Sequence, residues 1–211
     1  MQLTIDGKNI TPSQGESLRE LVVKLGLDSP LLSQRPLAAR IAGEVFTLNY
    51  VPQRQAEADS ERPSMRRAMA ASGGNIHLLR YGDSAGKEVY IRTAQFVVFL
   101  ALRQLWPQAR AVLSCTLGSS VFISVDRAED FSVERLKRQI NAIVASGIPL
   151  LRRQVPRDEA IVRYAAEGQP DKARLLSWRD NPYCSEYSYG DYRDDFFGEM
   201  APSTGYLTVW D

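Results

Sequence analysis

The hydrophobic pattern of the first fifty residues predicts a small mixed unit. Residues 2–5 alternate between polar and apolar positions, and Asp6-Gly7 supplies a tight hairpin turn. Residues 17–20, Ser-Leu-Arg-Glu, form a capping box ahead of apolar residues at helical spacing. Residues 38–48 contain two short apolar arms separated by an Ala-Gly pair, which indicates a second hairpin. The order strand, strand, helix, strand, strand predicts a small sheet crossed by one helix.

The chain changes character after residue 52. Residues 53–74 are polar, bounded by proline and glycine, and poor in large apolar side chains, which is typical of a linker. One helix is predicted near Ser64–Ala71. Three arginines of this stretch could contact phosphate, although a solvated helix face is the favoured interpretation; they are Arg62, Arg66 and Arg67.

A second unit is predicted from residue 75 onward. Residues 93–106 are apolar on nearly every side of a helix, so this helix must be buried on most sides. Residues 109–126 give two apolar arms around Gly118-Ser119, which indicates a hairpin.

The rest of the second unit mixes helices and strands. Ser132 is placed to cap a helix with one apolar stripe, and a further helix is predicted over 157–167. The final residues, 203–211, look like a strand. Because helices and strands do not alternate strictly, the sequence predicts an α+β fold.

Composition excludes several classes of protein. The 211 residues carry a formal charge of +1, so no whole-molecule field would gather nucleic acid, although a local basic patch could. Cys115 and Cys184 are too few for a disulfide framework, which favours a reducing compartment. The amino terminus lacks the apolar run of a signal peptide, and no stretch approaches the ~20 apolar residues that span a bilayer. We therefore expect a soluble, cytoplasmic protein without a membrane partner.

The single histidine, His77, limits the chemistry further. It lies in an alternating, strand-like run, and nothing near it forms a nucleophile motif. A strand position is therefore favoured over a catalytic one, and a histidine-rich metal site is excluded.

The stretch 81–93, YGDSAGKEVYIRT, contains a glycine-lysine pair that suggests a phosphate-binding loop. Such a loop needs glycine five positions before Gly86, a hydroxyl residue after Lys87, and a following helix. Here the two positions are Tyr81 and Glu88, and the residues after them look strand-like. We reject the phosphate loop and predict a glycine turn between two arms.

Several strings in the second unit resemble a known family. Gly86 to Tyr90 precede an apolar helix that ends in Gln-Leu-Trp-Pro at 104–107, and the likeness continues through 150–168 and 191–199. These strings are similar to the second, editing-type domain of threonyl-tRNA synthetase, and the first fifty residues look like its TGS domain. The resemblance implies a TGS-like β-grasp (ubiquitin-like) domain over 1–52 and a linker over 53–74. It further implies a threonyl/alanyl-tRNA synthetase second-additional-domain-like α+β domain over 75–211.

The same resemblance locates the zinc-binding pairs of the editing domain. Its HxxxH pair falls on Arg92 and Phe96, and its CxxxH pair falls on Phe196 and Met200. None of these side chains is a zinc ligand, so we expect no metal, no catalytic residue and no hydrolytic editing. Asp194 falls on the position of an aspartate associated with editing, and half of a structural ion pair, with Arg92 close by, is the alternative for it.

A second resemblance concerns the end of the chain. Arg92-Thr93 before the buried helix and the string at 200–207 are similar to bacterial uridine kinase-like nucleoside kinases. The resemblance implies a P-loop kinase domain beyond Asp211, using ATP and Mg, with this segment as a cofactor-free accessory region and that kinase domain as its partner. The alternative is a free-standing RNA- or tRNA-binding module, derived from the synthetase editing domain, without editing activity.

Two candidate binding surfaces follow from the resemblance. A ligand cleft would receive a nucleoside or nucleotide through an arginine among aromatic side chains, unless these aromatics pack the sheet and cover the cleft. Its residues are Arg92, Phe96, Tyr192, Asp194, Phe196, Met200 and Tyr206. A basic patch could lie along RNA phosphates, although acidic residues interrupt it and make RNA the less favoured partner. The patch comprises Lys137, Arg138, Arg152, Arg153 and Arg157.

Overall fold

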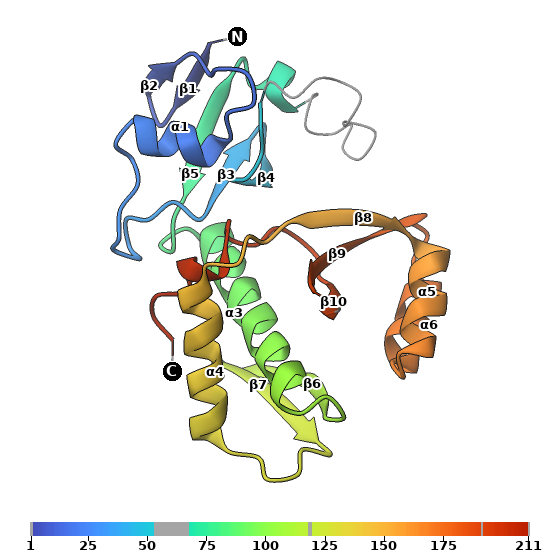
Figure 1. Cartoon of the computed structure of the whole chain (residues 1–211). Helices are drawn as coiled ribbons and strands as arrows, with labels where there is room; N and C mark the ends of the chain where they lie inside the picture. The colour runs from blue at the N-terminus through green and yellow to red at the C-terminus, as the bar shows by residue number, and fades with distance from the viewer. Residues whose placement is uncertain (1, 53–67, 118–119, 191, 211) are drawn as a thin grey trace.

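The computed structural model describes residues 2–52, 68–117, 120–190 and 192–210 (Figure 1). The amino-terminal part is a five-stranded mixed sheet in the order β2-β1-β5-β3-β4, with helix α1 lying across it. The elements are β1 (Leu3–Ile5), β2 (Lys8–Ile10), α1 (Leu18–Lys24), β3 (Ala38–Ile41), β4 (Glu44–Thr47) and β5 (Asn75–Leu79).

Local sequence signals account for these elements. Asp6 and Gly7 both have positive φ, at 45° and 81°, which closes the predicted β1–β2 hairpin. The Ser17 hydroxyl accepts from the Glu20 amide, and the Glu20 carboxylate accepts from the Ser17 amide, so the predicted capping box is present. Apolar residues of α1 and of the sheet form one buried cluster between them.

Strand β5 occupies the centre of this sheet. It pairs parallel with β1 and antiparallel with β3, although the sequence interpretation assigned residue 75 onward to the second unit. Ile76 and Leu78 are buried on the helix side, because β5 provides the middle of the core. His77 is a strand residue, as predicted, and its Nδ1 lies 3.1 Å from Asp6 Oδ1.

Only part of the predicted linker helix can be assessed. Residues 64–67 lie outside the described residues, as do the three arginines of that stretch, whereas residues 68–71 are helical. Ala68 and Met69 are buried in the amino-terminal core.

The second part of the chain contains a helix pair, a hairpin, a three-stranded antiparallel sheet and a second helix pair (Figure 1). This mixture agrees with the predicted α+β class. The elements are α3 (Ser84–Leu105), β6 (Arg110–Leu117), β7 (Ser120–Asp126), α4 (Val133–Ser146), β8 (Arg152–Pro156), α5 (Arg157–Ala166), α6 (Pro170–Ser177), β9 (Tyr183–Tyr189), β10 (Tyr192–Asp195) and η2 (Thr204–Tyr206). Helix α3 packs against α4 on one side and faces β9 and β10 on the other (Figure 1). None of the helices in the described residues is long and apolar enough to cross a membrane.

The beginning of α3 differs from the prediction. The helix starts at Ser84, so residues 88–91 are helical rather than strand-like, and the predicted turn at Gly86 is wrong because Gly86 lies inside the helix. Gly86, Val89, Tyr90 and Thr93 are buried at spacings of three and four residues, and the three-residue apolar run at 89–91 is too short to distinguish this period from a strand. Rejection of the phosphate loop therefore depends on Tyr81 and Glu88 alone.

The carboxyl-terminal segment also differs from the prediction, because it forms a 3-10 turn rather than a strand. The buried Thr204 hydroxyl accepts from the Ile148 amide at 2.9 Å and donates to the Ile143 carbonyl at 2.7 Å. These bonds hold the segment against the end of α4, and the backbone forms a single antiparallel bridge between Pro149 and Ser203 instead of a longer strand.

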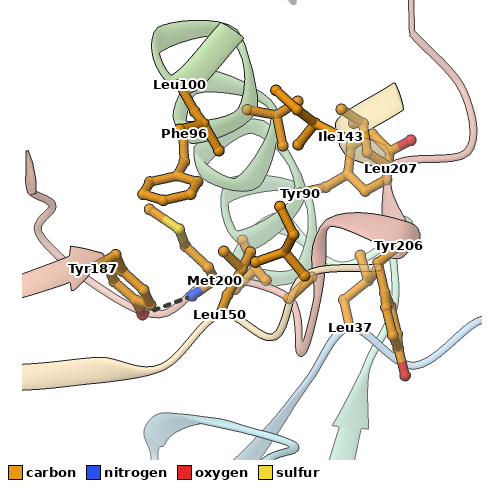
Figure 2. Packing of buried hydrophobic residues seen from close by; sticks show 14 of the residues in the cluster. Leu37, Tyr90, Phe96, Leu100, Ile143, Leu150, Tyr187, Met200, Tyr206 and Leu207 are labelled. Atoms are coloured by element: carbon orange, nitrogen blue, oxygen red, sulfur yellow. Dashed lines mark hydrogen bonds between the residues drawn. The ribbon is translucent and has the colours of Figure 1, made fainter. Parts of the chain in front are cut away.

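The two parts of the chain touch through polar and apolar contacts. Asn49 Nδ2 donates to the Leu150 and Pro202 carbonyls at 3.2 and 2.8 Å. The Arg35 guanidinium lies 3.9 Å from the centre of the Tyr206 ring. Leu37 enters the same buried cluster as α3 and α4 (Figure 2). The sheet and the helices are thus packed together.

Gly86→Ala is expected to destabilise the protein. A Cβ at this position would lie 1.9 Å from the Arg80 carbonyl oxygen. The energy cost of this overlap exceeds the roughly 1 kcal/mol that alanine gains over glycine in a helix. The free energy of unfolding, measured by urea denaturation, should fall by at least about 2 kcal/mol. Gly82→Ala is the matched control, because nothing lies within 4 Å of its added Cβ. Equal stability of the two variants would contradict this close approach.

Candidate functional site

The positions aligned with the zinc-binding pairs meet in space. The centre of the Phe96 ring on α3 lies 5.9 Å from Phe196, 5.5 Å from Tyr192 and 6.4 Å from Tyr187. Figure 2 shows the Met200 side chain directed toward the Phe96 ring, and both residues are buried. We call Phe96, Tyr187, Tyr192, Phe196 and Met200 the aromatic cluster. Its side chains occupy the place where the resemblance locates metal ligands.

Hydrogen bonds hold the segment after β10 against this cluster. The Met200 amide donates to the Tyr187 hydroxyl at 3.1 Å (Figure 2). The Ala201 amide donates to the Thr93 hydroxyl at 2.9 Å, and this hydroxyl donates to the Val89 carbonyl. The buried amides of Met200 and Ala201 and the Thr93 hydroxyl therefore all have partners inside the scaffold.

Arg92 is bound to the backbone of the same segment. Its Nη1 donates to the Glu199 carbonyl at 2.6 Å. The guanidinium lies against Gly198, where an added Cβ would come within 2.8 Å of Arg92 Cζ. Burial lowers the pKa of Arg92, while Tyr187, Glu88 and Glu199 oppose the change. The guanidinium thus has a structural partner at the position of the first expected zinc ligand.

Asp194 forms an ion pair, but its partner is Lys172 of α6 rather than Arg92. The Tyr192 hydroxyl also donates to Asp194, at 2.8 Å. Burial and the neighbouring Asp194 carboxylate raise the pKa of Tyr192 well above its usual value. Sequence reasoning missed Lys172 because α6 was not predicted; the proline at position 170, after Gly168, was the available signal of a helix start.

Tyr206 does not join the other candidate cleft residues. It lies in η2 and contacts Arg35 and Arg19 from the amino-terminal part of the chain. Burial raises the pKa of its hydroxyl. The predicted cleft is therefore divided between a filled aromatic cluster and a contact between the two parts of the chain.

The predicted basic patch is not one surface. Lys137 and Arg138 lie on α4, far from the β8–α5 junction (Figure 1). Arg152 donates to Glu199 Oε1 at 2.8 Å and to the Ser185 hydroxyl at 2.6 Å. Arg157 donates to the Arg179 carbonyl. Arg153 is the remaining residue of the predicted patch, and it lies on the opposite face of the sheet from Arg152.

Arg153 lines a pocket of about 330 Å³ on the outer face of the three-stranded sheet. The other lining residues are Val155, Glu186, Ser188, Gly190 and Arg193. Glu186 is buried and paired with Arg163 of α5; burial raises its pKa, while the nearby Tyr164 hydroxyl and the charge of Arg163 oppose the rise. Sequence reasoning missed Arg193, because the resemblance assigned a candidate role only to its neighbour Asp194.

A second pocket, of about 280 Å³, adjoins the first at Gly190. It lies between α3 and the opposite face of the sheet. Its other lining residues are Leu100, Arg103, Gln104, Tyr189 and Tyr192. The open space of this region thus surrounds the β9–β10 end of the sheet instead of the aromatic cluster.

No group of three or more histidine, cysteine or acidic side chains in the described residues is placed to hold a metal ion. The chain is an α+β protein, and the polar side chains at its two pockets include arginine, serine and tyrosine.

Comparison with known proteins relates this architecture to one class of enzyme. No protein-family model matches the chain. It is 26% identical over 204 residues to the threonine–tRNA ligase of Clostridium kluyveri, a match that covers 95% of this chain and 29% of the ligase. The ligases of Clostridium tetani and Symbiobacterium thermophilum are 24% and 25% identical over the same length, again at 95% of this chain.

The chain thus spans under a third of the length of these ligases, and the likeness extends over both parts of it. The resemblance to threonyl-tRNA synthetase is confirmed as a similarity. The resemblance to nucleoside kinases has no counterpart among these relatives.

Phe96→Ala tests whether the aromatic cluster is a packed core. Loss of the buried ring should lower the free energy of unfolding by about 3–5 kcal/mol, because the surrounding side chains cannot fill the cavity. Phe197→Ala is the control, since this side chain is 85% exposed and its removal should change stability by less than about 0.5 kcal/mol. A stability change for Phe96→Ala as small as that of the control would show a loosely filled site.

The two cysteines should differ in reactivity. Burial, with the nearby Glu186 and Asp195 carboxylates, raises the pKa of Cys184 to about 11, whereas Cys115 is exposed. At pH 8 only on the order of one Cys184 thiol in a thousand would be ionised. A disulfide reagent should therefore modify one thiol quickly and the second only after unfolding. Fast reaction of two thiols in the folded protein, with Cys115→Ser as the reference, would contradict this arrangement.

Proposed function

We propose that this chain is an RNA-binding module, directed at tRNA, that derives from the editing region of a threonine–tRNA ligase and has no editing activity. The observation that supports it is the similarity to these ligases across 95% of the chain, combined with apolar side chains at the expected metal positions. Within this proposal the five-stranded sheet with α1 is a TGS-like β-grasp module.

The aromatic cluster argues against hydrolysis. A zinc-dependent reaction needs donors with lone pairs and an open coordination position for water. A phenylalanine side chain has no lone pair to donate, and the thioether of Met200 is a soft donor that zinc rarely selects. The Phe96 ring is itself fully buried, so it leaves no open coordination position there.

Binding can persist without hydrolysis, because it depends on exposed groups rather than on the buried cluster. The outer face of the three-stranded sheet and the end of β9–β10 keep arginine and tyrosine side chains at open pockets. The ligases to which the chain is similar are named for tRNA, so tRNA is the RNA to test first. The relatives reported above are all ligases, and none of them supports the kinase interpretation.

The proposal predicts binding of tRNA without deacylation. Fluorescence anisotropy should give an affinity that weakens steeply as salt rises, because phosphate contacts release counterions. Incubation with mischarged tRNA, with and without added zinc, should release amino acid no faster than the tRNA alone. Uridine, which carries no phosphate, is the comparison ligand for the kinase interpretation and should not compete. Failure to bind tRNA at low salt, or measurable deacylation, would refute the proposal.

A further inference from the structure

Two arginines on the three-stranded sheet are available to a ligand. Arg153 of β8 and Arg193 of β10 are both exposed. Neither makes a hydrogen bond or salt bridge to any other residue within the part of the chain that the structure describes. Every other arginine of the predicted patch on β8 and α5 is bound to protein oxygen atoms.

The strand register directs both arginines to one face. Arg153 lies opposite Glu186 of β9, and Arg193 lies opposite Ser188, two residues further along the same strand. Residues two apart on a strand share a face, and outer strands of a three-stranded sheet are about 10 Å apart. Two long guanidinium side chains can therefore reach one anion placed above β9.

The charge around this pocket is positive. Glu186 is the carboxylate that lines it among the described residues, and it is paired with Arg163. Asp195, which lies opposite Glu186 on β10, is paired with Arg179 at 2.8 Å. Both acidic groups are paired with other arginines, so with Arg153 and Arg193 the positive charges around the pocket outnumber these two carboxylates.

We propose that Arg153 and Arg193, with the Ser188 hydroxyl, bind a phosphate group of single-stranded RNA in this pocket. Guanidinium groups match phosphate oxygens with paired, charge-assisted hydrogen bonds. The inference rests on the proposed function and specifies where the RNA backbone would be held.

The adjoining pocket favours a single strand over a duplex. It shares Gly190 with the arginine pocket and presents Tyr189, whose side chain is 42% exposed. An aromatic ring beside a basic groove is how proteins hold unpaired bases, because a base can stack on the ring while the phosphate is bound nearby. A duplex would keep its bases stacked on one another.

The test compares charge-removing variants of the full chain. Arg153→Gln and Arg193→Gln should each weaken binding of a labelled single-stranded oligonucleotide about tenfold. Each should also reduce the slope of log affinity against log salt by about 0.7. Arg138→Gln on α4 removes the same charge from an exposed site away from the pocket, and should change neither quantity by more than about twofold. Circular dichroism verifies that all variants are folded.

The outcomes separate the site from the function. If wild type binds RNA and the double variant Arg153→Gln/Arg193→Gln binds equally well, the pocket is refuted and the proposed function stands. Equal losses in Arg138→Gln would likewise refute the pocket, because they indicate diffuse attraction. If RNA does not bind but a nucleoside monophosphate does, with loss in the double variant, the phosphate pocket stands and the RNA function is refuted. Absence of binding by either ligand refutes both.

Discussion

Burial of the Phe96 ring at the middle of α3 is the constraint on which the second part of the chain depends. Helix α3 is apolar on nearly every side, so each side must be covered by something. Helix α4 and the amino-terminal sheet cover one side, whereas Tyr187, Tyr192 and Phe196 cover the other. An open metal site at this position would leave apolar surface in water. Filling it with aromatic rings joins β9, β10 and the segment after them to α3.

This packing gives the two faces of the three-stranded sheet different roles. The inner face is directed at α3 and is closed by the aromatic cluster and by the Asp194–Lys172 pair. The outer face is covered by α5 and α6 at one end and open at the other, where Arg153 and Arg193 lie. A scaffold that has lost its inner site can therefore still present a binding surface, because the closed core holds the outer strands in place.

Sequence reasoning was accurate where a signal is local. The capping box at Ser17 and the Ser132 cap of α4 act within a few residues, so they were predictable. The convergence of Phe96, Phe196 and Met200 also agreed with the resemblance. The predicted start of α3 was wrong because a three-residue apolar run, 89–91, suits the helical and the strand period alike. The basic patch failed because similar side chains, such as Arg152 and Arg153, point to opposite faces of one strand.

By itself, the sequence determined the hairpin turn at Asp6-Gly7, the caps at Ser17 and Ser132, the α+β class and the residue types at the positions aligned with the zinc-binding pairs. Tertiary structure alone decided that β5 lies at the centre of the amino-terminal sheet, because strand pairing joins residues more than sixty apart in the chain. It also decided which arginines are neutralised and which are available. An arginine's partner depends on the strand or helix that folds beside it. The spacing of residues in the sequence does not show which element that is.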